Sequence, residues 1–139
     1  MSGAQNSKNH SEWSSGDRTI VVLDDNRDDA YLITRQLKNG GIGGNVQSFE
    51  SAAEARVFLS EHPASLLIVA LNNRSEIGFE LLNWVRSQPQ LQRMLIVAAG
   101  ESGRAGDIQR AYDLGVNAYY TKGLDFNGFP EVLKQLIFV

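Results

Sequence analysis

The feature of this 139-residue chain that most constrains its fold is a short apolar run followed by a helical pattern, repeated five times. Most of the apolar runs are too short for helices and rich in Val, Ile and Leu, which is typical of strands buried on both faces. Apolar residues three and four positions apart follow each run and predict five helices. The predicted strands are TIVVL (19–23), VQSF (46–49), SLLIVAL (65–71), MLIVAA (94–99) and NAYY (117–120).

Capping residues delimit the predicted helices. The acidic stretch Asp24–Asp29 provides N-cap and first-turn residues for the first helix, and the glycines of NGGIGGN (39–45) end it. Ser51 and Glu54 form a capping box at the start of the second helix. Five β-α units with short connections form a parallel sheet with right-handed crossovers, so the pattern predicts a doubly wound α/β fold.

Composition limits the class of protein. Hydrophobic residues make up 42% and charged residues 21%, as in a globular domain, and the net charge of −3 gives no reason to expect nucleic-acid binding. The absence of cysteine excludes disulfides, and no apolar run is long enough for a membrane helix. Residues 1–17 are rich in Ser, Asn and Gly and lack the apolar centre of a signal peptide. We therefore expect a flexible tail over 1–17, one domain over 18–139 and a cytoplasmic location.

The carboxyl ends of the strands are where an open parallel sheet binds its ligands. The predicted strands end at Asp24 and Asp25, at Ala70, at Ala99 and just before Lys122. An adjacent pair of carboxylates suits Mg²⁺, which binds one or two carboxylates and keeps several waters. The alternative is that Asp24 and Asp25 only cap a helix and pair with Lys122.

Four segments carry a resemblance to a known family: IVVLDDNRDDAYLITRQL, LLIVALNN followed by GFELLNWVR, LIVAAGES, and LGVNAYYTKG. In order and spacing they resemble the receiver domain of two-component response regulators, and DDNRDDA resembles the stand-alone receivers of phytochrome-linked systems. The resemblance extends from Thr19 to about Leu136. It implies a flavodoxin-like five-stranded sheet with strand order 2-1-3-4-5 and a role in phosphorelay signal transduction.

Several functional positions of the family are retained. The acidic pair that holds Mg²⁺ in receivers matches Asp24 and Asp25, and the lysine that contacts the phosphoryl group matches Lys122. The switch aromatic, three residues before that lysine, matches Tyr119, while Gly123 stands at the family's cis-proline position. The resemblance therefore allows a weakened Mg²⁺ site at the acidic pair and requires no cofactor.

Two functional positions of the family are lost. The phosphoryl-accepting aspartate falls on Ala70, and the switch Thr or Ser falls on Ala99. No Asp or Glu occurs from His62 to Ser75, so a shift in alignment recovers no acceptor. A methyl group cannot form an acyl phosphate. We expect Lys122 to pair with Asp25 without a metal, because a third carboxylate is absent.

The end of the chain predicts a partner-binding face. Tyr119, Tyr120, Leu124 and Phe126 surround the fifth strand, a region that receivers use for partner binding and dimerisation. Strand alternation points one of the two tyrosines outward, so we expect at least one exposed aromatic. Phe129 is expected in the core.

The first hypothesis is a non-phosphorylatable pseudo-receiver that binds a sensor kinase, another receiver or a second copy of itself, and neither nucleic acid nor a membrane. One alternative is a metal or small-ligand sensor that uses Asp24, Asp25 and Lys122. Another is a phosphorelay regulator whose acceptor and switch residues were mutated to Ala70 and Ala99. An enzyme is not expected, because no nucleophile–base pair is apparent.

Overall fold

The computed structural model describes residues 18–72, 75–101, 104–122 and 128–137. The predicted tail and two residues of the predicted partner face, Leu124 and Phe126, lie outside the described residues. In the part of the chain that is described, no helix is long and apolar enough to cross a membrane.

Strands and helices alternate along the chain, as the apolar pattern predicts. The five strands are parallel and lie in the order β2-β1-β3-β4-β5, which confirms the predicted doubly wound sheet. The elements are β1 (Thr19–Leu23), α2 (Arg27–Asn39), β2 (Asn45–Phe49), α3 (Ala52–Glu61), β3 (Leu66–Leu71), α4 (Ile77–Arg86), the 3-10 turn η1 (Pro89–Leu91), β4 (Leu95–Gly100), α5 (Ala105–Asp113), β5 (Ala118–Thr121) and α6 (Phe129–Ile137).

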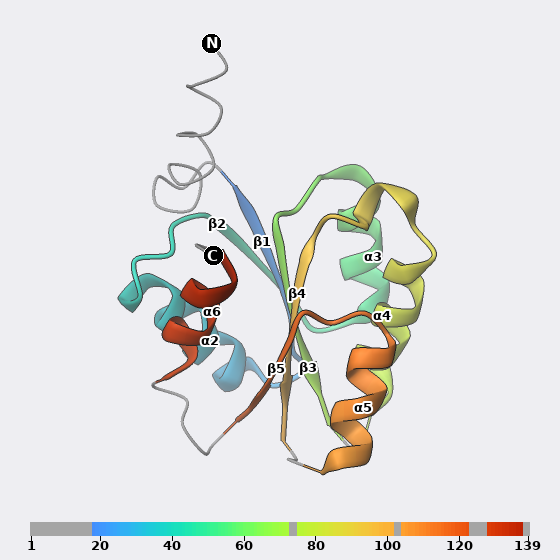
Figure 1. Ribbon diagram of the computed structural model, residues 1–139. Coiled ribbons are helices and arrows are strands. Elements are labelled where there is room, and N and C mark those ends of the chain that lie inside the picture. The colour runs from blue at the N-terminus through green and yellow to red at the C-terminus, as the bar shows by residue number, and fades with distance from the viewer. Residues whose placement is uncertain (1–17, 73–74, 102–103, 123–127, 138–139) are drawn as a thin grey trace.

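Helices cover both faces of the sheet (Figure 1). Helices α2 and α6 pack on one face, and α3, α4 and α5 pack on the other. Successive residues of each strand therefore enter different cores: Val22 packs toward α2 and α6, whereas Leu23 packs toward α3, α4 and α5. Every residue of β3 is buried, which explains its continuous apolar sequence.

Local hydrogen bonds set the helix ends. The side chain of Asn26 accepts from the backbone N–H of Asp29 at the start of α2, so the N-cap is an asparagine and the predicted acidic cap is wrong. Ser51 caps α3 through the N–H of Glu54, as predicted. Helix α2 ends in a Schellman motif with Gly41 at φ +75°, a backbone conformation that favours glycine.

Candidate functional site

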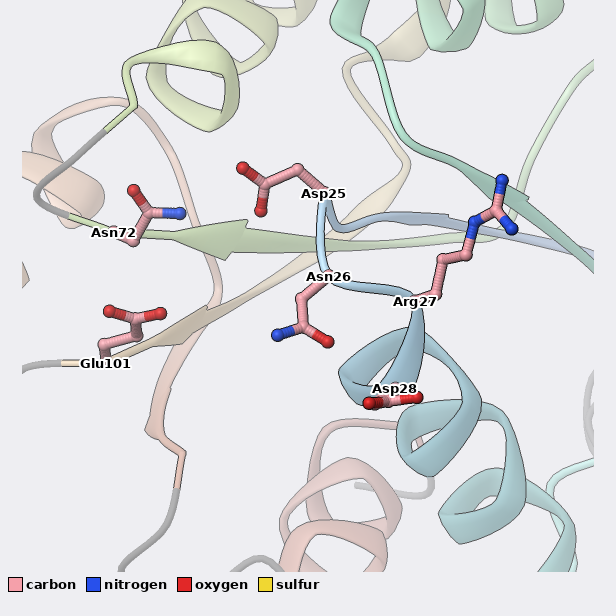
Figure 2. A pocket seen from close by; sticks show the side chains of 6 residues that line it. All are labelled: Asp25, Asn26, Arg27, Asp28, Asn72 and Glu101. Carbon is pink, nitrogen blue, oxygen red and sulfur yellow. The ribbon is translucent and has the colours of Figure 1, made fainter.

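The candidate site lies at the carboxyl edge of the sheet. The residues after β1, β3 and β4 border a pocket of about 420 Å³ (Figure 2). In Figure 2, Asn72 lies at the end of β3 and Glu101 at the end of β4, while Asp25 lies between β1 and α2. Arg27 also borders the pocket, but it forms an ion pair with Glu50 on the β2 side. Polar side chains from three loops therefore face one opening.

Lys122 is held by two carboxylates. Its Nζ lies 2.8 Å from Asp24 Oδ2 and 2.9 Å from Asp29 Oδ2. The predicted pairing with Asp25 is wrong, because Asp25 is exposed at the pocket. Since Leu23 packs toward α3, α4 and α5, strand alternation directs Asp24 to the opposite face of the sheet. The first turn of α2 then brings Asp29 to the same lysine.

Burial governs the electrostatics of this ion pair. Asp24 is only 2% exposed, and burial raises the pKa of its carboxyl despite the hydrogen bonds that it accepts from Lys122 and from the Asn26 N–H. Burial by itself lowers the pKa of Lys122, but the hydrogen bonds to Asp24 and Asp29 outweigh it and raise that pKa overall. Lys122 is thus a protonated lysine whose two carboxylate partners come from this chain.

Ala70 and Ala99 are neighbours at the centre of the carboxyl edge. They are paired in register between β3 and β4 and are 6% and 1% exposed. Neither side chain offers an oxygen. Where the family resemblance places an acceptor carboxylate and a hydroxyl, the described structure therefore has two buried methyl groups.

The ring of Tyr119 lies across strand β4 at Gly100. A Cβ added to Gly100 would lie 1.8 Å from the Tyr119 hydroxyl oxygen, so the ring fits only because residue 100 has no side chain. Tyr119 is half-buried and packs toward α3, α4 and α5, the face to which Ala98 also points. Ala99 points to the other face by strand alternation. The β4 residue beside the Tyr119 ring is therefore Gly100 and not Ala99.

The environment of Tyr119 affects its ionisation. Burial raises the pKa of its phenol, and the negative charge of Asp107 on α5 raises that pKa further. The ring therefore remains protonated above the pH at which an ordinary tyrosine ionises.

Tyr120 points into the core. It is 8% exposed and meets Phe129 edge-on with 5.1 Å between ring centroids. Phe129 is fully buried, as predicted. The expectation that one of the two tyrosines is exposed is wrong, because helices cover both faces of the sheet at β5 and neither Tyr119 nor Tyr120 is exposed.

The site does not fit a tightly bound divalent cation. One oxygen of Asp24 accepts from Asn26 and the other from Lys122, so a cation at Asp24 would have to compete with the positive charge of Lys122. Across the described residues, no three His, Cys, Asp or Glu side chains are grouped so that they could hold an ion. Asp25 and Glu101 remain as exposed carboxylates at the pocket.

The family model of the response regulator receiver domain matches residues 20–134 of this chain. The chain belongs to the receiver domain family. The response regulator Rcp1 of Synechocystis sp. is 26% identical over 133 residues, which cover 91% of this receiver and 90% of Rcp1. The transcriptional regulatory protein GltR of Pseudomonas aeruginosa is 31% identical over 124 residues, which cover 89% of this receiver and 50% of GltR.

Solved structures confirm the likeness to phytochrome-linked receivers. The phosphorylated cyanobacterial phytochrome response regulator RcpA matches with a TM-score of 0.72 at 28% identity, covering 86% of this receiver and 90% of RcpA. The bacteriophytochrome response regulator RtBRR matches with a TM-score of 0.74 at 26% identity, covering 86% of this receiver and 77% of RtBRR. The Mn²⁺-bound form of Rcp1, at 23% identity and a TM-score of 0.72, shares the fold.

Two residues of the receiver site were not selected from the sequence. Asp29 is the last acidic residue of DDNRDDA, and its place in the first turn of α2 was a usable signal. Gly100 follows Ala99, and its signal was the two-residue alternation that puts it on the same face as Ala98.

Proposed function

We propose that this receiver domain is a pseudo-receiver, which signals through protein–protein contact and is not phosphorylated. The observation that carries the proposal is Ala70 at the end of β3, in the position that the family resemblance assigns to the acceptor aspartate. A methyl group offers no nucleophile for an acyl phosphate. The family's phosphoryl chemistry therefore has no acceptor at its usual place, and the domain is not an enzyme.

The pairing of Lys122 supports the proposal. In the receiver family this lysine contacts the phosphoryl group, whereas here Asp24 and Asp29 engage it at 2.8 and 2.9 Å. RcpA has been solved phosphorylated, and this chain lacks the acceptor carboxylate that the family resemblance implies for such a state. Mg²⁺ is accordingly not required, and its affinity is low.

The packing of the Tyr119 ring supports a receiver that has a single conformational state. The gap at Gly100 accommodates the ring with no phosphoryl group and no hydroxyl at Ala99. A receiver in this state contacts its partner through the surface around β5 and α5, where Tyr119 is half-buried; Leu124 and Phe126, which the sequence adds to this face, lie outside the described residues. We infer that the partner is a sensor kinase, another receiver or a second copy of this domain, in the cytoplasm, and neither nucleic acid nor a membrane.

A ligand sensor built on Asp24, Asp25 and Lys122 is less well supported. Asp24 and Lys122 already satisfy each other, so a ligand would have to break a buried ion pair before it could bind. A transcriptional role, which the name of GltR gives to that protein, is not proposed for this chain, because the chain spans only half of the length of GltR.

Affinity capture tests the proposal. The full chain is used as bait in an extract of the organism that encodes it, with and without acetyl phosphate. We expect the same protein partner under both conditions, and weaker capture by a Tyr119→Ala variant than by the control Tyr31→Ala, whose side chain is 64% exposed on α2. The proposal would be contradicted if the partner were captured only after acetyl phosphate had phosphorylated this chain.

A further inference from the structure

A basic stretch of the chain has no role in the receiver site. From Leu81 to Gly100 the sequence contains Arg86 and Arg93 but no Asp or Glu, although the whole chain has a net charge of −3. The stretch runs from α4 through η1 into β4, and the part that carries both arginines, from the end of α4 to the start of β4, lies at the end of the sheet opposite the carboxyl edge (Figure 1). Its charge is therefore remote from the pocket at Asp25.

Both arginines border one small cleft, which we name the Arg86–Arg93 cleft. Its volume is about 160 Å³. Its polar wall consists of Arg86, Gln92, Arg93 and Asn117, and its apolar lining includes the buried Met94. Positive charge is thus concentrated beside a partly apolar surface.

The two guanidinium groups lack carboxylate partners within the described residues. The ion pairs found there belong to other cations, namely Arg27, Arg110, Lys122 and Lys134. Asp113, two residues before Gly115 of the cleft, instead accepts a hydrogen bond of 2.8 Å from Gln109. Both arginines therefore border the same cleft, and no carboxylate of the described structure forms an ion pair with either.

Three of the four polar residues of the cleft, Arg86, Gln92 and Asn117, contact other parts of the chain. Arg86 lies across Gly115, since a Cβ on that glycine would come within 3.0 Å of its Cδ and Nη1 atoms. Gln92 donates from its side chain to the carbonyls of Arg86 and Gln88, at 3.1 and 2.8 Å. The Asn117 side chain accepts from the backbone N–H of Ile96 at 2.8 Å. A ligand would therefore immobilise few side chains on binding.

We propose that the Arg86–Arg93 cleft is a binding site for a phosphate-class dianion, either free phosphate or a small phosphate monoester. Two guanidinium groups match the charge of a dianion, and each can donate two parallel N–H bonds to its oxygens. The cleft is below the roughly 300–1,000 Å³ of pockets for drug-sized ligands, so a phosphate group with a small substituent fits and a nucleotide does not. The site is independent of the proposed function at the carboxyl edge.

The test is a titration of the ¹⁵N-labelled full chain with inorganic phosphate, and in a second arm with methyl phosphate, at constant ionic strength. We expect saturable amide shifts at Arg86, Gln92, Gly115 and Asn117 and none at Lys122. Tighter binding of methyl phosphate identifies an ester as the ligand, and equal or weaker binding identifies free phosphate. Shifts that are absent, that match those from sodium chloride, or that centre on Lys122 would overturn the site.

Variants separate binding from folding. Arg86→Gln and Arg93→Gln should each weaken phosphate binding about tenfold, as expected for loss of a charge-assisted hydrogen bond. Arg86→Lys keeps the charge and the packing stem over Gly115 and should bind with intermediate affinity. The control Arg35→Gln, on the exposed side of α2, should bind phosphate like the unmodified chain, and thermal melts without phosphate confirm that each variant folds. Equal loss in the control, or no loss in either cleft variant, contradicts the proposal.

Discussion

The hydroxyl oxygen of Tyr119 lies 1.8 Å from the point that a Cβ on Gly100 would occupy, so the ring takes the space of that missing side chain on the face of the sheet that α3, α4 and α5 cover. The glycine is required there by the close approach of the ring, not by its backbone conformation. The position of the Tyr119 ring in this receiver thus depends on the absence of a side chain in the neighbouring strand.

Gly100→Ala should turn the Tyr119 ring out of this space. The atom that must move is the end of a flexible side chain, so we expect the free energy of unfolding to change by about 1 kcal/mol or less. Burial is the largest cause of the raised pKa of Tyr119, and that pKa should fall back toward 10.0. The measurement is the tyrosinate absorbance of Gly100→Ala as a function of pH. Subtracting the curve of the double variant Gly100→Ala/Tyr119→Phe isolates the titration of Tyr119. An unchanged Tyr119 titration would show that the ring had not moved.

Lys122→Met should strongly destabilise the fold. It leaves Asp24, whose side chain is 1% exposed, as a buried carboxylate without its cation, and breaking a buried pair in this way costs about 3 kcal/mol. Urea unfolding measures the loss, and the exposed Lys38→Met on α2 is the matched control. Adding Asp24→Asn to Lys122→Met should recover part of the stability. If the double variant is no more stable than the single one, the pairing does not explain the loss.

The same pair predicts a dependence of stability on alkaline pH. Because the folded-state pKa of Lys122 lies above its ordinary value of 10.5, its contribution is complete below that pH and is lost as pH rises through the folded value. Asp24 also has a raised pKa, so its contribution to the free energy of unfolding follows the same rule at acid pH. That contribution is complete below pH 3.8 and is lost as the pH rises through the folded-state pKa. The stability difference between the unmodified chain and Lys122→Met should therefore shrink above about pH 10.5. A difference that stays constant there would rule out titration of this lysine.

Divalent cations should stabilise this receiver little. With Asp24 engaged by Lys122 and no acceptor carboxylate at Ala70, millimolar Mg²⁺ should leave the melting temperature unchanged relative to sodium chloride of equal ionic strength. Ala70→Asp adds a carboxylate at the end of β3 and should introduce an Mg²⁺-dependent rise in its melting temperature. A clear Mg²⁺-dependent rise in the unmodified chain would instead support the ligand-sensor alternative.

The sequence predicted the sheet well because each strand carries its own signal. The apolar run of residues 66–71 is buried along its whole length, and the strand order agrees with the family resemblance. Strand ends were less certain: β4 extends to Gly100 and β5 to Thr121, each one residue beyond the predicted end. Those extra residues lie at the carboxyl edge, where the side chains of the site are placed.

The pairings within the site were harder to predict because they join residues far apart in the chain. Lys122 pairs with Asp24 and not with Asp25 because Leu23, the last residue of β1, points to the opposite face of the sheet. The sequence does not distinguish two adjacent carboxylates in this way. The contact between Tyr119 and Gly100 was also not predicted. Ala99 and Gly100 are adjacent in β4, so they point to opposite faces of the sheet, and only Gly100 shares the face of the Tyr119 ring.

The most direct test of the central claim is intact-mass analysis of the unmodified chain after incubation with acetyl phosphate and Mg²⁺. A receiver that retains its acceptor aspartate, treated in parallel, shows that the phosphodonor is active. We expect no phosphoryl adduct on this chain, because the next-to-last residue of β3 is Ala70, whose methyl group stands where the family resemblance places the acceptor. An adduct that hydroxylamine removes, as it removes acyl phosphates, would contradict the account, whichever carboxylate carried it.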